Sequence, residues 1–140
     1  MALLPDGEYL IKNVAAEDLY IDLYGANPEP NTPIVGWQLT KGDNQKWKIT
    51  TVNGVNEFTL KSKAGEAYMG LSLLRIFPPL IASEPMPVKW SVEPVGENMF
   101  RLAFPYMDGT LTLQRPAQGA QLALEPWRGD ELQKWTFESA

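Results

Sequence analysis

The sequence predicts an all-β domain of about twelve short strands, arranged in three pseudo-symmetric four-strand repeats. The chain contains 11 glycines and 12 prolines along its whole length, which is typical of short strands joined by tight turns. No long segment shows clean helical periodicity. A Lys-Trp pair followed by a polar and then an apolar residue occurs once in each repeat, at Trp47, Trp90 and Trp135.

Each repeat contains three further predicted strands ahead of its tryptophan strand. The first strands are expected around residues 9–11, 58–60 and 100–102. The second are expected at 19–23, 67–71 and 109–113, and the third at 33–38, 79–82 and 120–124. We predict one domain over residues 1–140, with repeats of approximately 7–53, 54–96 and 97–140. A closed three-fold barrel suits three repeats better than a propeller, because closure leaves no exposed strand edge.

The composition argues against several classes of function. A formal net charge of −5 disfavours binding to nucleic acid and to anionic membranes. The chain has no cysteine and no histidine, so we expect no disulfide framework, no metal site and no cofactor. The apolar stretch 71–82 is interrupted by Arg75 and by prolines, and it is too short to insert across a bilayer. No signal peptide is recognised, and a cytoplasmic protein is expected.

The ends of the repeats carry a family motif. Gln-X-Trp begins at Gln45 and at Gln133, whereas Val88 replaces the glutamine in the second repeat. This pattern resembles the β-trefoil domains of the ricin-B type. The chain is most similar to the β-trefoil lectins of mushroom fruiting bodies over residues 19–25, 33–37 and 44–47. The resemblance implies a β-trefoil that binds carbohydrate. We expect no enzyme, because the sequence has no histidine, no cysteine, no Gly-rich phosphate loop and no nucleophile-elbow motif.

Three residues of the first repeat are candidates for a sugar site on chemical grounds. Trp37 offers an aromatic face that can stack on the C–H face of a sugar ring. Asp22, inside an apolar strand, offers a carboxylate that can accept hydrogen bonds from neighbouring hydroxyls. Asn44 offers an amide that both donates and accepts. Each residue also has a structural interpretation: a half-buried tryptophan, a solvated strand aspartate and a residue that closes the turn 41–44.

The resemblance gives these residues a common role. In the lectins that the chain resembles, the corresponding side chains bind terminal galactose or N-acetylgalactosamine, in glycans of the lactose, LacNAc or LacdiNAc type. That role falls here on Asp22, Trp37 and Asn44, with Gly25 offering a backbone N–H and Lys41 at the rim. The resemblance further implies a fungal defence protein, toxic to nematodes or insects that graze on the fungus.

We expect one working site in each chain. The three Lys-Trp tryptophans recur by symmetry among apolar neighbours and are expected in the core. The positions of Asp22, Trp37 and Asn44 are occupied by Gly70, Leu80 and Pro87 in the second repeat and by Thr112, Glu125 and Leu132 in the third. Neither set can stack a ring and hold its hydroxyls. Trp127, out of register with Trp37, is a relic of a site, a core residue or part of a partner surface.

Other classes of function stay open at this stage. A β-trefoil protease inhibitor could act through the proline-rich loop 26–33, because a stiff loop loses little entropy on docking. A glycosidase would need two carboxylates, such as Asp22 and Asp43, in one cleft. A structural or partner-binding trefoil would ignore every glycan. A homodimer would raise the avidity of a weak site, and the apolar stretch 73–81 is either such an interface or the base of the barrel.

Overall fold

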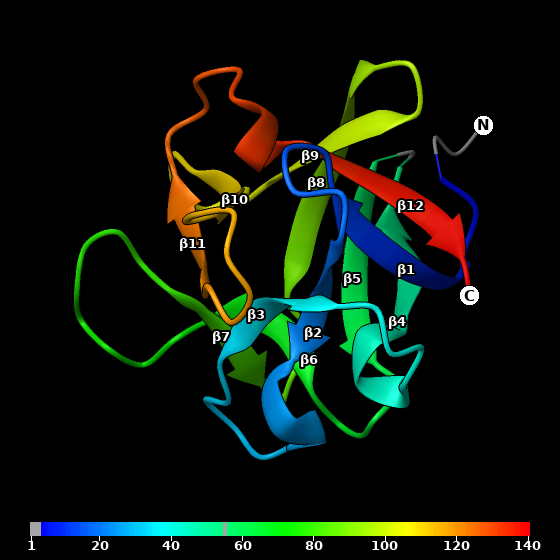
Figure 1. Cartoon of the computed structure of the whole chain (residues 1–140), viewed down its shortest axis with the longest axis vertical. Coiled ribbons are helices and arrows are strands. Elements are labelled where there is room, and N and C mark those ends of the chain that lie inside the picture. Colours follow the sequence, from blue (N-terminus) through cyan, green and yellow to red (C-terminus); the bar gives the residue numbers. More distant parts are fainter. Residues whose placement is uncertain (1–3, 55) are drawn as a thin grey trace.

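Six strands pair into a closed barrel. The computed structural model describes residues 4–54 and 56–140 (Figure 1). The barrel strands, each antiparallel to the next, are β1 (Gly7–Asn13), β4 (Trp47–Asn53), β5 (Glu57–Ser62), β8 (Lys89–Gly96), β9 (Met99–Ala103) and β12 (Trp135–Ser139). Because β12 pairs back onto β1, every barrel strand has a neighbour on both sides.

Three hairpins cover one end of the barrel, one from each repeat. They are β2 (Leu19–Leu23) with β3 (Ile34–Gln38), β6 (Tyr68–Leu71) with β7 (Ile81–Glu84), and β10 (Thr110–Leu113) with β11 (Leu122–Glu125). Single β-bridges join each hairpin to the other two: Pro33 to Ala82, Val35 to Gln121, and Leu80 to Ala123. The described residues thus form a β-trefoil of twelve strands, which confirms the predicted fold class.

The three recurring tryptophans form the centre of the core. Trp47, Trp90 and Trp135 are 0%, 0% and 1% exposed, which confirms the predicted core role. Each indole Nε1 donates a hydrogen bond to a carbonyl of the second strand of its own repeat. The N···O distances are 3.1 Å to Ile21, 2.9 Å to Met69 and 3.1 Å to Leu111. Each bond therefore satisfies a buried indole N–H and ties a barrel strand to a hairpin.

The register of the hairpins corrects one predicted correspondence. Trp37 pairs with Tyr20 in β2–β3, and Glu84 takes the same place opposite Tyr68 in β6–β7. The counterpart of Trp37 is therefore Glu84, and the prediction of Leu80 was wrong. Counting back from the tryptophan failed because repeat two has a shorter connection after its third strand. Repeats one and three carry 3₁₀ turns there, η2 (Asp43–Gln45) and η3 (Glu131–Gln133).

The apolar stretch predicted over residues 73–81 divides into two parts. Leu73, Leu74, Ile76 and Phe77 are exposed, Phe77 at 86%, in the β6–β7 loop that projects from the molecule in Figure 1. Only its end enters the core, at Ile81. The projecting part does not complete the base of the barrel. Within residues 4–54 and 56–140, no helix is long and apolar enough to cross a membrane.

Truncating a core tryptophan should destabilise the fold severely. Trp90→Ala removes a fully buried ring and leaves the Met69 carbonyl without its indole donor. We expect the free energy of unfolding to fall by about 3–5 kcal/mol, measured by urea denaturation. Met86→Ala, in the same repeat but 68% exposed, is the control and should change stability by less than about 0.5 kcal/mol. A loss below about 1 kcal/mol for Trp90→Ala would contradict this description of the core.

Candidate functional site

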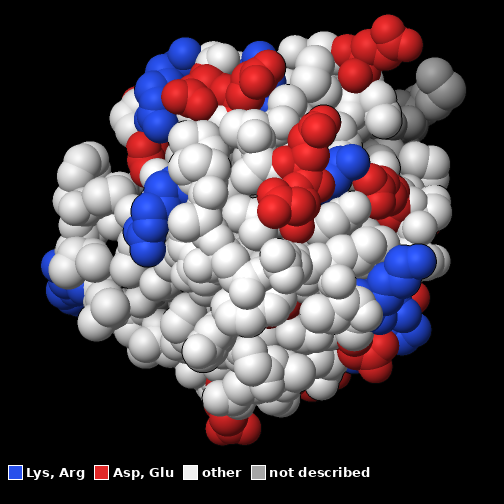
Figure 2. Space-filling view, in the orientation of Figure 1, with Lys and Arg blue, Asp and Glu red and all other residues white. Residues whose placement is uncertain are grey.

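A cavity of about 340 Å³ opens beside the β2–β3 hairpin. Its lining includes four of the five predicted site residues, together with two that were not predicted, and consists of Asp22, Tyr24, Gly25, Trp37, Thr40 and Asn44. Lys41 is exposed and lies outside this lining. In Figure 2 the surface over β2 and β3 is mostly uncharged, whereas charged side chains lie above it and at the edges of this face. Asp22 is therefore a single carboxylate in a largely neutral setting.

Asp22 is held in the cavity wall by two side-chain amides. It is only 3% exposed, and it follows Ile21, the residue whose carbonyl is bonded to Trp47. Asn44 Nδ2 donates to its Oδ1 at 3.1 Å, and Gln45 Nε2 donates to its Oδ2 at 2.9 Å. Burial raises the pKa of Asp22, and the hydrogen bonds from Gln45 and Asn44 oppose that rise. The carboxylate has accepting capacity left for a ligand.

Gln45 connects the carboxylate to the rest of the site. Its side chain is fully buried, and Nε2 also donates to the carbonyl of Gln38 at 2.8 Å. Its Oε1 accepts from the backbone N–H groups of Thr40 at 2.8 Å and Lys41 at 3.3 Å. Gln45 thus fixes the end of β3, the following turn and Asp22 at once. It was not predicted as a site residue, although its recurrence in Gln-X-Trp was the available signal.

Asn44 has a narrower role than its chemistry alone suggested. Its Nδ2 donates both to Asp22 and to the carbonyl of Leu23, each at 3.1 Å. These two bonds use both amide hydrogens, so the atom left for a ligand is the acceptor Oδ1. Glycine at position 42 leaves room for this oxygen, because a Cβ there would approach Oδ1 to 2.8 Å. Asn44 therefore offers an acceptor where a group that both donates and accepts was predicted.

Two aromatic rings form the apolar part of the wall. Tyr24 and Trp37 pack edge to face, with ring centroids 6.1 Å apart and an interplanar angle of 68°. Tyr24 is 51% exposed, so its ring stands at the rim. Gly25 follows it in η1 (Tyr24–Ala26) with φ +65°, a backbone conformation that favours glycine. A Cβ at Gly25 would meet no protein atom within 4 Å, so backbone conformation, not crowding by the protein, accounts for the glycine.

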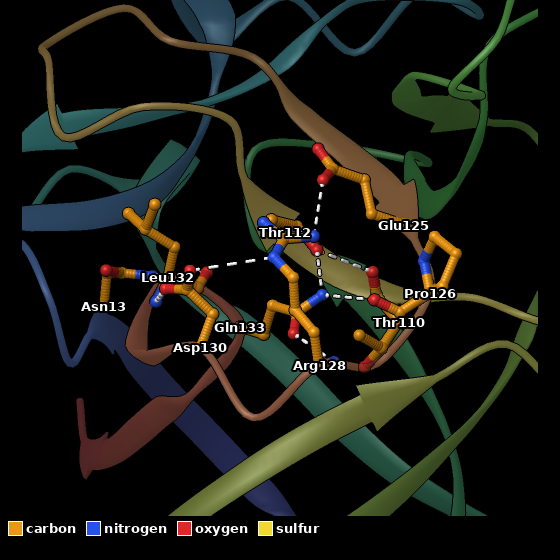
Figure 3. Close-up of polar contacts among 9 residues, drawn as sticks. All are labelled: Asn13, Thr110, Thr112, Glu125, Pro126, Arg128, Asp130, Leu132 and Gln133. Carbon is orange, nitrogen blue, oxygen red and sulfur yellow. Dashed lines mark hydrogen bonds and ion pairs between the residues drawn. The ribbon is translucent and has the colours of Figure 1, made fainter.

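The third repeat keeps the scaffold and loses the ligand groups (Figure 3). Gln133 Nε2 donates to the carbonyl of Pro126 at 2.9 Å, and its Oε1 accepts from the N–H of Arg128 at 3.0 Å, as Gln45 does in repeat one. Where Gln45 meets a carboxylate, Gln133 meets the Thr112 hydroxyl at 3.2 Å. That hydroxyl donates in turn to the carbonyl of Thr110. Glu125, in the place of Trp37, is paired with Arg128 at 2.8 Å.

The second repeat closes the equivalent position with its own side chain. Glu84 Oε2 accepts from the backbone N–H of Leu71 at 2.8 Å and lies over Gly70, the counterpart of Asp22. A Cβ at Gly70 would collide with that oxygen. Between β7 and β8 the described chain has no 3₁₀ turn of the kind that carries Asn44 in repeat one. The geometry of the two other repeats therefore supports one site per chain.

Trp127 belongs to a separate small cavity of about 170 Å³. The Arg101 guanidinium lies over its ring, 4.9 Å from the centroid, and also pairs with Glu93 at 2.7 Å. Trp127 is half-buried, so of the three roles left open for it, that of a fully buried core residue does not apply. Trp127 is covered by an arginine that is already paired with Glu93, whereas Trp37 lines a cavity together with Asp22.

The closed barrel, the three capping hairpins and the cavity in repeat one define a β-trefoil with the architecture of lectin domains. The family model described as "Ricin-type beta-trefoil lectin domain-like" matches residues 3–73, half of the chain, and the chain belongs to this family. The sequence match thus covers the repeat that holds the cavity.

Solved structures of lectins share the fold over the whole chain. The agglutinin of Rhizoctonia solani superposes with a TM-score of 0.89 at 23% identity, covering 100% of this chain and 99% of its own. The ricin B-like lectin of Macrolepiota procera, solved with lactose, gives 0.85 at 24% identity and covers 100% of both chains. The C-terminal half of an earthworm R-type lectin, solved with GalNAc, gives 0.72 at 22% identity, covering 97% and 100%. At these identities the likeness concerns the fold.

The raised pKa of Asp22 predicts a pH-dependent stability. The pKa of Asp22 in the folded protein lies above the ordinary 3.8. Its protonation therefore stabilises the fold, and this stabilisation is fully present below the pKa of the unfolded chain. The stabilisation is lost as the pH rises through the pKa of Asp22 in the folded protein. We expect the free energy of unfolding of the wild type to fall relative to Asp22→Asn as the pH rises from below 3.8 through the raised pKa of Asp22, measured by urea denaturation. Asp18→Asn, at an exposed position, is the control for charge. A difference that stays constant, or changes in the opposite sense, would refute the assignment.

Proposed function

We propose that this protein is a lectin that binds glycans ending in galactose or N-acetylgalactosamine through the cavity of the first repeat. The observation that carries the proposal is the meeting of a buried carboxylate and an aromatic pair in one cavity of about 340 Å³. A sugar has a hydroxyl edge and a C–H face, and this cavity offers a partner for each.

The roles follow from the bonds that the site residues already make. Asp22 accepts one amide hydrogen on each oxygen and has capacity for two sugar hydroxyls. Asn44 adds an acceptor, since its hydrogens are already used. Trp37 takes the C–H face, and Tyr24 supports it at the rim. Galactose and N-acetylgalactosamine suit this arrangement, because their axial 4-hydroxyl leaves one ring face as a continuous C–H surface.

Two of the similar lectins were solved with sugars of the proposed kind. The Macrolepiota lectin was solved with lactose, and the earthworm lectin with GalNAc. One shallow site of this kind should bind a monosaccharide with about 4–6 kcal/mol, or roughly millimolar to tens of micromolar affinity. A homodimer would raise the avidity. The dimer, the cytoplasmic location and the fungal defence role stay predictions.

Binding without turnover is part of the proposal. Hydrolysis of a glycosidic bond ordinarily needs two carboxyl groups that flank it. Among the described residues that line the cavity, Asp22 is the single carboxylate, and Asp43 does not join it. The geometry therefore favours recognition of a glycan over cleavage.

No specific observation favours the alternative of a protease inhibitor. The loop 26–33 is folded onto the body of the protein by its own polar groups. The Glu29 carbonyl accepts from the hydroxyls of Thr32 at 2.7 Å and Ser83 at 2.8 Å. The Asn31 backbone N–H donates to the Ser83 carbonyl at 2.9 Å. A panel of trypsin, papain and legumain assays remains the direct check of this alternative.

Removing the carboxylate should abolish useful sugar binding. On a glycan array, we expect the wild type to bind β-galactosides and to be competed by lactose. Asp22→Ala should lose roughly 10- to 100-fold in affinity, because hydrogen bonds to a charged group contribute about 1.5–3 kcal/mol each. Asp18→Ala, at an exposed aspartate just before β2, is the matched control.

Circular dichroism shows whether each variant is folded. If Asp22→Ala does not fold, Trp37→Ala provides a second test. Binding that survives both substitutions would place the site elsewhere. Failure of the folded wild type to bind any glycan would refute the lectin proposal.

Sugar binding should weaken at mildly acidic pH. The ionised carboxylate is the stronger acceptor, and burial raises the pKa of Asp22 above 3.8. Affinity should therefore begin to fall at a higher pH than an ordinary aspartate would give. Titration calorimetry with lactose at a series of pH values measures this. An affinity that is constant down to the onset of acid unfolding would contradict the role of Asp22.

A further inference from the structure

A second cavity, of about 300 Å³, adjoins the first. The two cavities share the Tyr24–Trp37 pair in their walls. The rest of the second lining comes from β3 and the residues just before it, and from the segment that precedes β11: Pro33, Val35, Gly119 and Gln121. A ligand seated against the aromatic pair in the first cavity therefore has an adjoining space toward the third repeat.

The third-repeat wall is firmly attached to β3. Gly119 N donates to the Gly36 carbonyl at 2.8 Å, and Gly36 N donates to the Ala120 carbonyl at 2.9 Å. Gln118 Oε1 accepts from the Gln38 N–H at 3.1 Å. Figure 1 shows this segment, in orange, running beside β3. These bonds give the second cavity a preformed shape.

Gly119 brings the backbone close to the shared aromatic wall. Its φ of +86° favours glycine, and a Cβ built there would lie 3.7 Å from Cζ3 of Trp37. The third repeat therefore reaches the edge of the indole at Gly119, while Tyr24 packs against the ring from the first repeat. Trp37 is in this way positioned to contact ligands in both cavities.

The chemistry of the second cavity suits a neutral polar ligand with an apolar face. Among the described residues that line it, none is charged. Val35 and Pro33 supply apolar surface beside the two rings. Gln121 Nε2 donates to the Ile81 carbonyl at 2.9 Å, which leaves its Oε1 as an acceptor for a hydroxyl.

We propose that this second cavity is a subsite for the sugar residue next to the terminal one in the same glycan. The inference rests on the proposed lectin function and adds the length of the ligand to it. The terminal residue would occupy the cavity at Asp22. The next residue would pack on Val35 and Pro33 and donate a hydroxyl to Gln121. The protein should then prefer a disaccharide to its terminal monosaccharide.

The test compares two pairs of probes by titration calorimetry. Methyl β-galactoside is compared with lactose, and methyl β-N-acetylgalactosaminide with LacdiNAc. The wild type should bind the disaccharide of at least one pair roughly 3- to 10-fold more tightly, as one further neutral hydrogen bond allows. Gln121→Ala should remove most of this gain. Gln114→Ala, an exposed glutamine in the same connection, is the matched control.

A second measurement on the wild type covers the case in which Gln121→Ala fails to fold. The methyl signals of Val35 in an NMR spectrum should shift with the disaccharide and not with the monosaccharide. If the monosaccharide binds, but the disaccharide binds no more tightly and leaves Val35 unshifted, the subsite is refuted and the lectin proposal stands. If no probe of either pair binds the folded protein, the proposed function itself fails.

Discussion

The hydrogen bond from each core tryptophan to the second strand of its repeat is the constraint on which the rest of the structure depends. It joins the barrel to the capping hairpins at three symmetry-related points. In repeat one the acceptor is Ile21, so the next residue, Asp22, is set at the border between core and cavity. A charge could not stay buried there without partners. Gln45 and Asn44 supply them from the turn just before Trp47.

The buried glutamine that holds the turn of the site occurs independently of the groups that would contact a ligand. Repeat three retains the buried glutamine and its bonds to the preceding turn, yet it presents a hydroxyl that is already bonded. The described part of repeat two has no 3₁₀ turn before its tryptophan strand, and the Glu84 side chain occupies the position that corresponds to the cavity. The glutamine thus stabilises the connection whether or not a carboxylate is present. A Gln-X-Trp motif alone therefore indicates the fold, whereas the residues opposite the glutamine indicate binding.

Much of the fold could be predicted because its signals are local. The second strand of repeat one was expected at 19–23, the limits that it has, and the core tryptophans follow from their recurrence. Asp22, Trp37 and Asn44 were expected to meet, and they do. Tyr24 and Thr40 were missed because their contribution depends on turn geometry, which residue types do not reveal. Leu80 was wrongly aligned because sequence spacing does not show where a connection has been shortened.

The two adjoining cavities differ in how far apart along the chain their walls lie. Every lining residue of the first falls between residues 22 and 44, within one repeat. The second needs Gly119 to reach Trp37, and such distant contacts carry a larger loop-closure entropy. Duplication of the first repeat within a gene would therefore duplicate every lining residue of the first cavity, but not the residues that the third repeat contributes to the second. The ability to tell a longer glycan from a shorter one would then belong to the finished three-fold assembly, as a property that no single repeat inherits.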